Sequence, residues 1–287
     1  MNLQSRLSQQ ARFVLTLIMI GGLVSCGDSN TSQPELDTTA SQTLGYTKIN
    51  EPNADDPLDA QIYELDNGLK VYLTENHEEP RFYAEIAVRA GSKHDPADGT
   101  GLAHYLEHLL FKGNQNLGTL DYEAEKPYLD EIVNLYEEHF SATDDERRAE
   151  IYSEINRVAQ IAAEYAVPNE IDKIYNSMGG TGLNAHTWYE ETVYKIGLPS
   201  NRLKQWAEIE SDRFVNPVFR LFHTELETVY EEKNRSLDNA GRIIGTAIDE
   251  LLYKVHPYGQ QPTIAVSYTH LRAHETRHDL VCRLLLE

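Results

Sequence analysis

Residues 101–113 read Gly-Leu-Ala-His-Tyr-Leu-Glu-His-Leu-Leu-Phe-Lys-Gly, and the fold of the chain is expected to be organised around them. We expect one short helix here, because leucines recur at helical spacing between two glycines. At about 100° per residue, His104 and His108 share one face, so two imidazoles can reach one tetrahedral metal ion. Glu107 lies on the same side and is placed to hydrogen-bond a water at the metal.

A pair of histidines on a helix is more often a polar surface patch than a metal site. The five-residue pattern His104-x-x-Glu107-His108 is more specific, because it is the inverted signature of zinc peptidases. With only 11 histidines in 287 residues, chance alone rarely produces it. The pattern therefore predicts a catalytic metal centre.

A catalytic zinc site needs a third protein ligand and one open position. The predicted helix of residues 222–237 is a candidate source, because it carries several glutamates. Glu225 and Glu232 are seven positions apart and therefore lie within about 20° of each other on one face, whereas Glu231 points away. An ordinary solvated helix would explain the same glutamates without a metal.

The first 26 residues predict a targeting segment that is not part of the fold. Arg6 and Arg12 precede an apolar run that is too short for a permanent membrane span. The run ends in Leu-Val-Ser-Cys26, which resembles the cleavage box of bacterial lipoproteins. The resemblance implies acylation of Cys26 and a lipid anchor in the cell envelope, in the outer membrane facing the periplasm. An ordinary secretory signal is the alternative.

Residues 27–57 are polar and are expected to form a flexible tether. Beyond the tether, the pattern of apolar residues predicts strands and helices in alternation. The expected strands are 61–65, 69–75, 82–90, 183–187 and 192–194, and the later helices are 122–139, 144–166, 169–178, 202–215, 222–237 and 242–255. Charged residues on the helices between 121 and 178 are more typical of a solvated face than of a binding site.

The composition excludes some partners and some kinds of site. A net charge of −21 would repel a phosphate backbone, so we expect no nucleic-acid partner. The two cysteines, Cys26 and Cys282, fit neither a disulfide framework nor a thiolate zinc site. A structural zinc protein, whose closed site is usually rich in cysteine, is therefore a less suitable alternative.

These residues together resemble the insulinase/pitrilysin family of zinc metallopeptidases over about residues 58–264. The resemblance rests on three motifs: His104-x-x-Glu107-His108, Asn184-Ala185-x-Thr187 with Thr192-x-Tyr194, and Glu225-x6-Glu232. It implies that one zinc ion is held by His104, His108 and Glu232.

The resemblance also implies roles for other residues. Glu107 would be the general base, and Glu225 would support the face that carries the ligands. Asn184 and Ala185 would lie on an edge strand that pairs with the backbone of an extended peptide.

The implied fold is α+β, an antiparallel sheet with helices packed on one side, and residues 121–178 would be a helical insert. The implied function is a zinc-dependent endopeptidase that hydrolyses extended peptides. A homologous second half, in the same chain or as a partner subunit, would close the chamber. The alternative is a non-catalytic peptide-binding or scaffold homologue, and activity of this chain alone is left open.

Residues 265–287 depart from the family pattern and resemble a translated sequencing adapter. We expect them to be foreign to the gene, and the native chain to continue from about Ile264. His270, His274 and His278 recur every four residues, which on a helix would align three imidazoles. A second metal site there is disfavoured, because the first is complete without it.

Overall fold

The computed structural model describes residues 45–51, 55–97 and 99–260. The chain divides into two compact units, residues 1–75 and 76–287. The expected targeting segment, most of the tether and the expected foreign tail lie outside the described residues. Within the described ranges, none of the helices combines the length and the apolarity needed to cross a membrane.

The first unit contains a three-stranded antiparallel sheet. Its strands are β1 (Tyr46–Lys48), β2 (Gln61–Leu65) and β3 (Lys70–Leu73), in the order β1-β2-β3. The expected hairpin is confirmed, and its turn requires a glycine because Gly68 has φ of +86°.

Strand β1 lies inside the stretch expected to be a flexible tether, and that expectation is wrong for these residues. Tyr46 pairs with Leu65 in the ladder, and its ring packs edge-on against the ring of Tyr63 at 5.6 Å. The partner strand supplies both contacts. The strand forms because of these contacts to β2, so it could not be predicted from the composition of its own segment.

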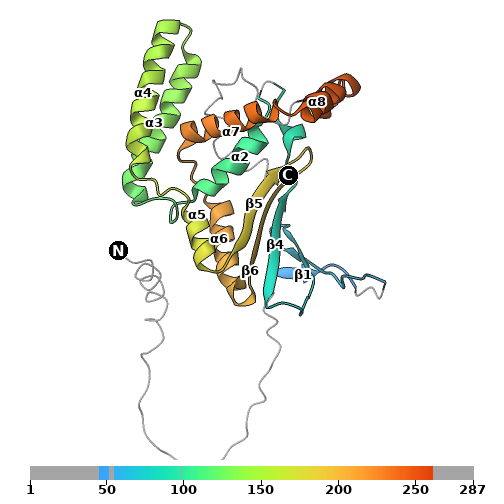
Figure 1. Ribbon diagram of the computed structural model, residues 1–287. Coiled ribbons are helices and arrows are strands. Elements are labelled where there is room, and N and C mark those ends of the chain that lie inside the picture. The colour runs from blue at the N-terminus through green and yellow to red at the C-terminus, as the bar shows by residue number, and fades with distance from the viewer. Residues whose placement is uncertain (1–44, 52–54, 98, 261–287) are drawn as a thin grey trace, which may run out of the picture. The chain divides into compact units, whose positions relative to one another are not determined.

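The second unit is built on another three-stranded antiparallel sheet. Its strands are β4 (Arg81–Val88), β5 (Thr181–Thr187) and β6 (Thr192–Pro199), in the order β4-β6-β5 (Figure 1). Among the strands that the structure describes, β6 is central in this sheet and β5 lies at an edge. Asn184 and Ala185 are therefore on an edge strand, as the resemblance implies.

Helices pack against one face of this sheet. Ile196 and Leu198 of β6 form a buried core with Ile171 and Tyr175 of α5 (Glu170–Ser177), and Trp206 of α6 (Leu203–Val215) packs against it. Side chains on the opposite face, such as Tyr83, are exposed. This alternation is the period of a strand that is buried on one side only. The expected α+β class, with helices on one side of an antiparallel sheet, is confirmed.

The helix that carries the histidine motif is α2 (Leu102–Leu109), and a 3-10 turn (Leu110–Lys112) continues it. Gly101 and Gly113 flank it with φ of 89° and 101°, backbone angles that glycine adopts without strain. The predicted limits at these two glycines are confirmed.

The N-terminus of α2 is capped by a residue to which the sequence patterns gave no role. The buried carboxylate of Asp95 accepts hydrogen bonds from the backbone N–H of Gly101 at 2.7 Å and of Ala103 at 2.9 Å. Burial raises the pKa of Asp95 to about 7, against the effect of these bonds. Asp95 lies seven positions before Leu102, the first residue of the helix, which is outside the spacing that a capping box predicts.

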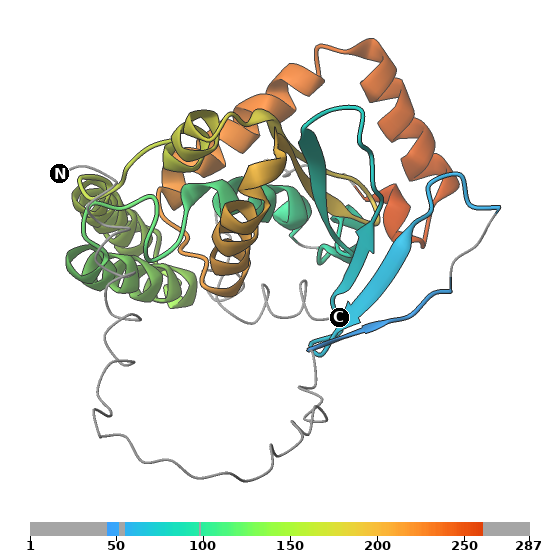
Figure 2. The same ribbon diagram turned by 90° about the horizontal axis from the view of Figure 1, so that it is seen from below.

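The expected helical insert consists of α3 (Tyr122–Ser141), α4 (Asp145–Ala163) and α5. Asp144 caps α4, as expected, by accepting a hydrogen bond from the backbone N–H of Arg147 at 2.9 Å. Helices α3 and α4 lie side by side as a hairpin to one side of the sheet (Figures 1 and 2). The remaining helices are α7 (Phe222–Ser236) and α8 (Ala240–Leu252), with 3-10 turns at Ser92–His94, Ser200–Arg202 and Pro257–Gly259.

Candidate metal centre

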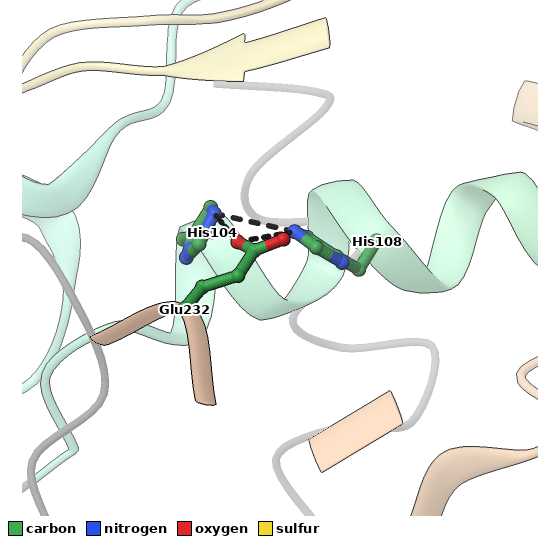
Figure 3. Close-up of side chains that lie close together, drawn as sticks. All are labelled: His104, His108 and Glu232. Carbon is green, nitrogen blue, oxygen red and sulfur yellow. Dashed lines mark hydrogen bonds and ion pairs between the residues drawn. The ribbon is translucent and has the colours of Figure 1, made fainter. Parts of the chain in front are cut away.

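Three side chains from two helices converge on one point. His104 and His108 stand on α2, and Glu232 stands on α7 (Figure 3). The two imidazole Nε2 atoms are 3.3 Å apart, and Glu232 Oε2 lies 3.6 Å from that of His104 and 3.5 Å from that of His108. A tetrahedral zinc ion with bonds of about 2.1 Å holds its ligand atoms about 3.4 Å apart. The three atoms therefore have the spacing of ligands around a single ion.

Packing between α2 and α7 brings the three side chains together. Leu102, Tyr105 and Leu109 of α2 form a buried cluster with Val229 of α7. The hydroxyl of Tyr105 also donates a hydrogen bond to the carbonyl of Phe222 at the start of α7, at 2.6 Å. These contacts turn the glutamate face of α7 toward the histidines.

A buried arginine fixes the start of α7 against the loop that follows α2. Arg220 is 2% exposed and donates to the carboxylate of Glu125 in α3, at 2.9 Å for the nearer pair. The same guanidinium donates to the carbonyls of Lys112 and Leu117, at 2.7 and 3.0 Å, and to that of Asn114 at 2.9 Å. A buried guanidinium needs such a set of partners. Arg220 therefore ties both helices of the site to α3.

Glu225 supports one of the histidines from behind. His108 Nδ1 donates to Glu225 Oε1 at 2.8 Å, and Lys112 forms an ion pair with the other oxygen. Burial alone would raise the pKa of Glu225, but the bonds from His108 and Lys112 hold it below its ordinary value. An ionised carboxylate only accepts hydrogen bonds, so Nδ1 of His108 carries a proton, and in the neutral imidazole the Nε2 lone pair faces the site. Burial lowers the pKa of His108, but the neighbouring carboxylates outweigh burial and raise it.

His104 is suited to donate a lone pair as well. Burial, together with the charges of His108 and Arg242, lowers the pKa of His104 to about 4. Its imidazole is therefore neutral at neutral pH, as a metal ligand must be. Its Nδ1 is buried and has no hydrogen-bond partner among the described residues, so nothing there plays the part that Glu225 plays for His108.

Replacing Glu225 by glutamine is expected to weaken zinc binding about 10- to 100-fold, the usual effect of losing a carboxylate behind a histidine ligand. The amide accepts a weaker hydrogen bond from His108 and cannot form the ion pair with Lys112. Competition with a zinc chelator measures the change. Glu227→Gln is the matched control, because Glu227 is exposed on the same helix. Equal affinities of the Glu225 variant and the unchanged protein would contradict this role.

Glu107 lies beside the three converging side chains without being one of them. It is only 6% exposed, and the charges of His108 and Glu232 are near enough to act on it. Burial raises its pKa, and a hydrogen bond from the hydroxyl of Thr187 at 2.6 Å opposes that rise. A carboxylate with a raised pKa is suited to accept a proton near neutral pH.

The other expected site residues lie apart from this group. Asn184 and Ala185 are on β5, and the backbone N–H of Ala185 donates to the side-chain oxygen of Asn184 at 2.9 Å. Helix α2 packs against this strand, so the edge runs next to the helix of the motif. Cys26 and the tail histidines lie outside the described residues. The ligand, base and peptide-pairing roles stay predictions.

Sequence reasoning gave no role to three residues that hold the site in place. Asp95 caps α2, Lys112 pairs with Glu225, and Thr187 bonds Glu107. Thr187 belongs to the motif with Asn184 and Ala185, so the sequence pointed to this residue. The pattern did not predict its hydrogen bond to Glu107. Lys112 follows His108 by four positions, which places both on one helical face.

Comparison with known proteins gives partial matches, and the family match includes the histidine motif. The family described as insulinase (peptidase family M16) matches residues 70–126. A probable zinc protease, PqqL, of Haemophilus influenzae is 37% identical over 67 residues, which are 22% of this chain and 7% of that protein. Insulin-degrading enzyme-like 1, peroxisomal, of Arabidopsis thaliana is 24% identical over 245 residues, 83% of this chain and 20% of that protein. The chain thus spans a fifth or less of either relative.

A solved structure has a similar fold. A protease from Helicobacter pylori is 20% identical, and the match covers 79% of this chain and 42% of that one with a TM-score of 0.52. The match supports the fold of the chain.

Proposed function

We propose that the chain carries the catalytic part of an insulinase-family zinc metallopeptidase, an endopeptidase that hydrolyses extended peptides. One observation carries the proposal: the ligand atoms of His104, His108 and Glu232 have the spacing of one tetrahedral ion, beside the buried carboxylate of Glu107. The family match over residues 70–126 and the likeness to zinc proteases support the choice of metal and reaction.

The donor set fits a catalytic zinc ion better than a structural one. Two imidazoles and one carboxylate leave a fourth position open, whereas structural sites are usually closed by four ligands and rich in cysteine. In its neutral form, His108 has the tautomer that a ligand needs, because Glu225 accepts from its other nitrogen. When bound, zinc would polarise the peptide carbonyl and lower the pKa of a coordinated water toward 7.

The side chains of the protein supply the proton transfer. Glu107 would accept a proton from the attacking water and return it to the nitrogen of the leaving amine, so the carboxylate ends in its starting state. Because Glu107 is buried, its carboxylate has few competing waters and a raised pKa. This reaction needs no serine or cysteine nucleophile.

The peptide would add to the free edge of β5. The outward backbone groups of the stretch that contains Asn184 and Ala185 would pair with an extended substrate. A homologous second half, in the same chain or as a partner subunit, would cover the peptide from the other side.

Removal of the metal tests the proposal. We expect the protein, alone or together with its second half, to cleave a quenched fluorescent peptide library. The cleavage should stop when a chelator removes the metal and return when one equivalent of zinc is added. Cleavage that persists without metal would contradict the proposed chemistry. Binding of zinc and peptide without any cleavage, in either form of the protein, would favour the non-catalytic homologue.

We also propose that the protein is a lipoprotein of the bacterial cell envelope, anchored through Cys26. The support is the apolar run that ends in Leu-Val-Ser-Cys26. Cys26→Ser should move the protein from the membrane fraction to the soluble fraction of cells, because the acylated thiol would be lost. Immunoblots of the two fractions measure this. A Cys26→Ser protein that is processed normally and still sediments with membranes would refute the anchor.

A further inference from the structure

The expected base is held by a hydroxyl from the edge strand. Thr187 Oγ1 donates to Glu107 Oε2 at 2.6 Å, across 80 positions of sequence. Glu107 is 6% exposed, so few waters can replace this partner. A buried carboxylate that loses its hydrogen-bond donor is free to turn toward another one. The bond is therefore placed to hold the orientation of the carboxylate.

The direction of this hydroxyl is set by a second threonine. Thr192 faces Thr187 across the β5–β6 ladder, with their oxygens 3.2 Å apart. The hydroxyl of Thr192 donates to the carbonyl of Ala90 at 2.8 Å. The proton of Thr192 is therefore used in the bond to Ala90. Of the two hydroxyl contacts of Thr187, the shorter is the one to Glu107. The proton of Thr187 therefore points at the carboxylate.

The strand end that carries Thr187 is also fixed. The backbone N–H groups of Ser92 and Lys93 donate to the carbonyls of Trp188 and Tyr189, at 2.9 and 3.0 Å. A side chain at Gly91 would place its Cβ 2.2 Å from the carbonyl oxygen of Trp188, so the two backbones lie in close contact. The hydroxyl of Thr187 therefore stands at a strand end whose backbone is held against the backbone of residues 91–93.

We propose that Thr187 is a positioning residue for Glu107 and couples the base to the strand that receives the peptide. The inference rests on the proposed function. Thr187 holds Oε2, which leaves Oε1 to face the reacting water. Asn184 and Ala185 stand three and two positions earlier on the same strand, so a peptide paired there would be in register with the base. Thr187 touches neither substrate nor metal in this arrangement.

A pair of substitutions separates positioning from simple packing. Thr187→Val keeps the size of the side chain and removes the hydroxyl, whereas Thr187→Ser keeps the hydroxyl. We expect the valine variant to lose about ten- to hundredfold in kcat, the range for one hydrogen bond to a charged group, with KM changed by less than about threefold. The serine variant should recover most of kcat. Thr228→Val is the control, because Thr228 is an exposed helical residue.

Two readouts do not depend on activity. Zinc content, measured by elemental analysis, should be the same in the valine variant and the unchanged protein. A crystal structure of the metal-free valine variant should show the Glu107 carboxylate turned away from β5 or in several orientations. A valine variant with full kcat, or with Glu107 unmoved, would overturn the inference. A loss of zinc or an equal loss of kcat in the serine variant would also overturn it. An unchanged protein without any cleavage would instead refute the proposed function.

Discussion

Glu107→Gln is expected to lower kcat for peptide hydrolysis by about 10²- to 10⁴-fold, the range for loss of a positioned general base. Glutamine has the same shape and still accepts the hydrogen bond from Thr187, so the fold of the site should persist. Its amide cannot take a proton from the attacking water. The effect should therefore fall on the chemical step and leave KM nearly unchanged.

Cleavage of a quenched peptide and zinc content are measured on the same preparation. Glu146→Gln is the control, because Glu146 is exposed on α4. The expected pattern is full zinc content in all proteins and loss of cleavage in the Glu107 variant alone. A Glu107 variant that cleaves at the unchanged rate would assign the proton transfer to another group.

Glu232→Gln is expected to remove the third ligand and to weaken zinc binding by more than about 100-fold, beyond the loss that a supporting carboxylate causes. The neutral amide oxygen is a weaker ligand than a carboxylate, and the two histidines alone leave the ion half coordinated. Cleavage should fall with the metal. Added zinc should restore part of it, in contrast to the Glu107 variant, which holds zinc and stays inactive.

Glu231→Gln is the matched control for this change. Glu231 is the preceding residue on α7 and is exposed, and it is not one of the three converging side chains. Both substitutions remove one negative charge from the same turn, so a general change in charge would affect both. Equal zinc affinity in the Glu232 variant and the unchanged protein would exclude Glu232 as a ligand. Glu225 would then be the next candidate.

The local parts of this structure could be predicted because their causes lie within a few residues. Leucines at helical spacing between Gly101 and Gly113 define α2, and a turn at Gly68 defines the first hairpin. The seven-residue spacing of Glu225 and Glu232 also showed which glutamates share a face. In each case the pattern repeats with the period of one helix or one strand.

The long-range contacts could not be predicted from such patterns. Asp95 caps a helix that begins seven positions later, and Thr187 reaches Glu107 across 80 positions. Strand β1 exists because β2 offers it a ladder. Each of these features depends on which two segments of the chain meet in space. The periodicity of apolar residues within one segment does not show which other segment it will contact.

The site shows how the two kinds of information combine. The sequence placed His104 and His108 on one face, but the third ligand could be chosen only by family likeness. The structure then puts Glu232 within 3.6 Å of both imidazoles and puts Glu225 behind His108. The two glutamates share a face of α7, yet they meet opposite sides of one histidine.

The most direct test of the central claim is diffraction from zinc-treated crystals of the protein, collected at the zinc absorption edge. We predict one strong anomalous peak about 2.0–2.2 Å from the Nε2 atoms of His104 and His108 and from a carboxylate oxygen of Glu232, with no fourth protein ligand. A peak at other residues, a fourth protein side chain on the ion, or no peak at these three would contradict the account.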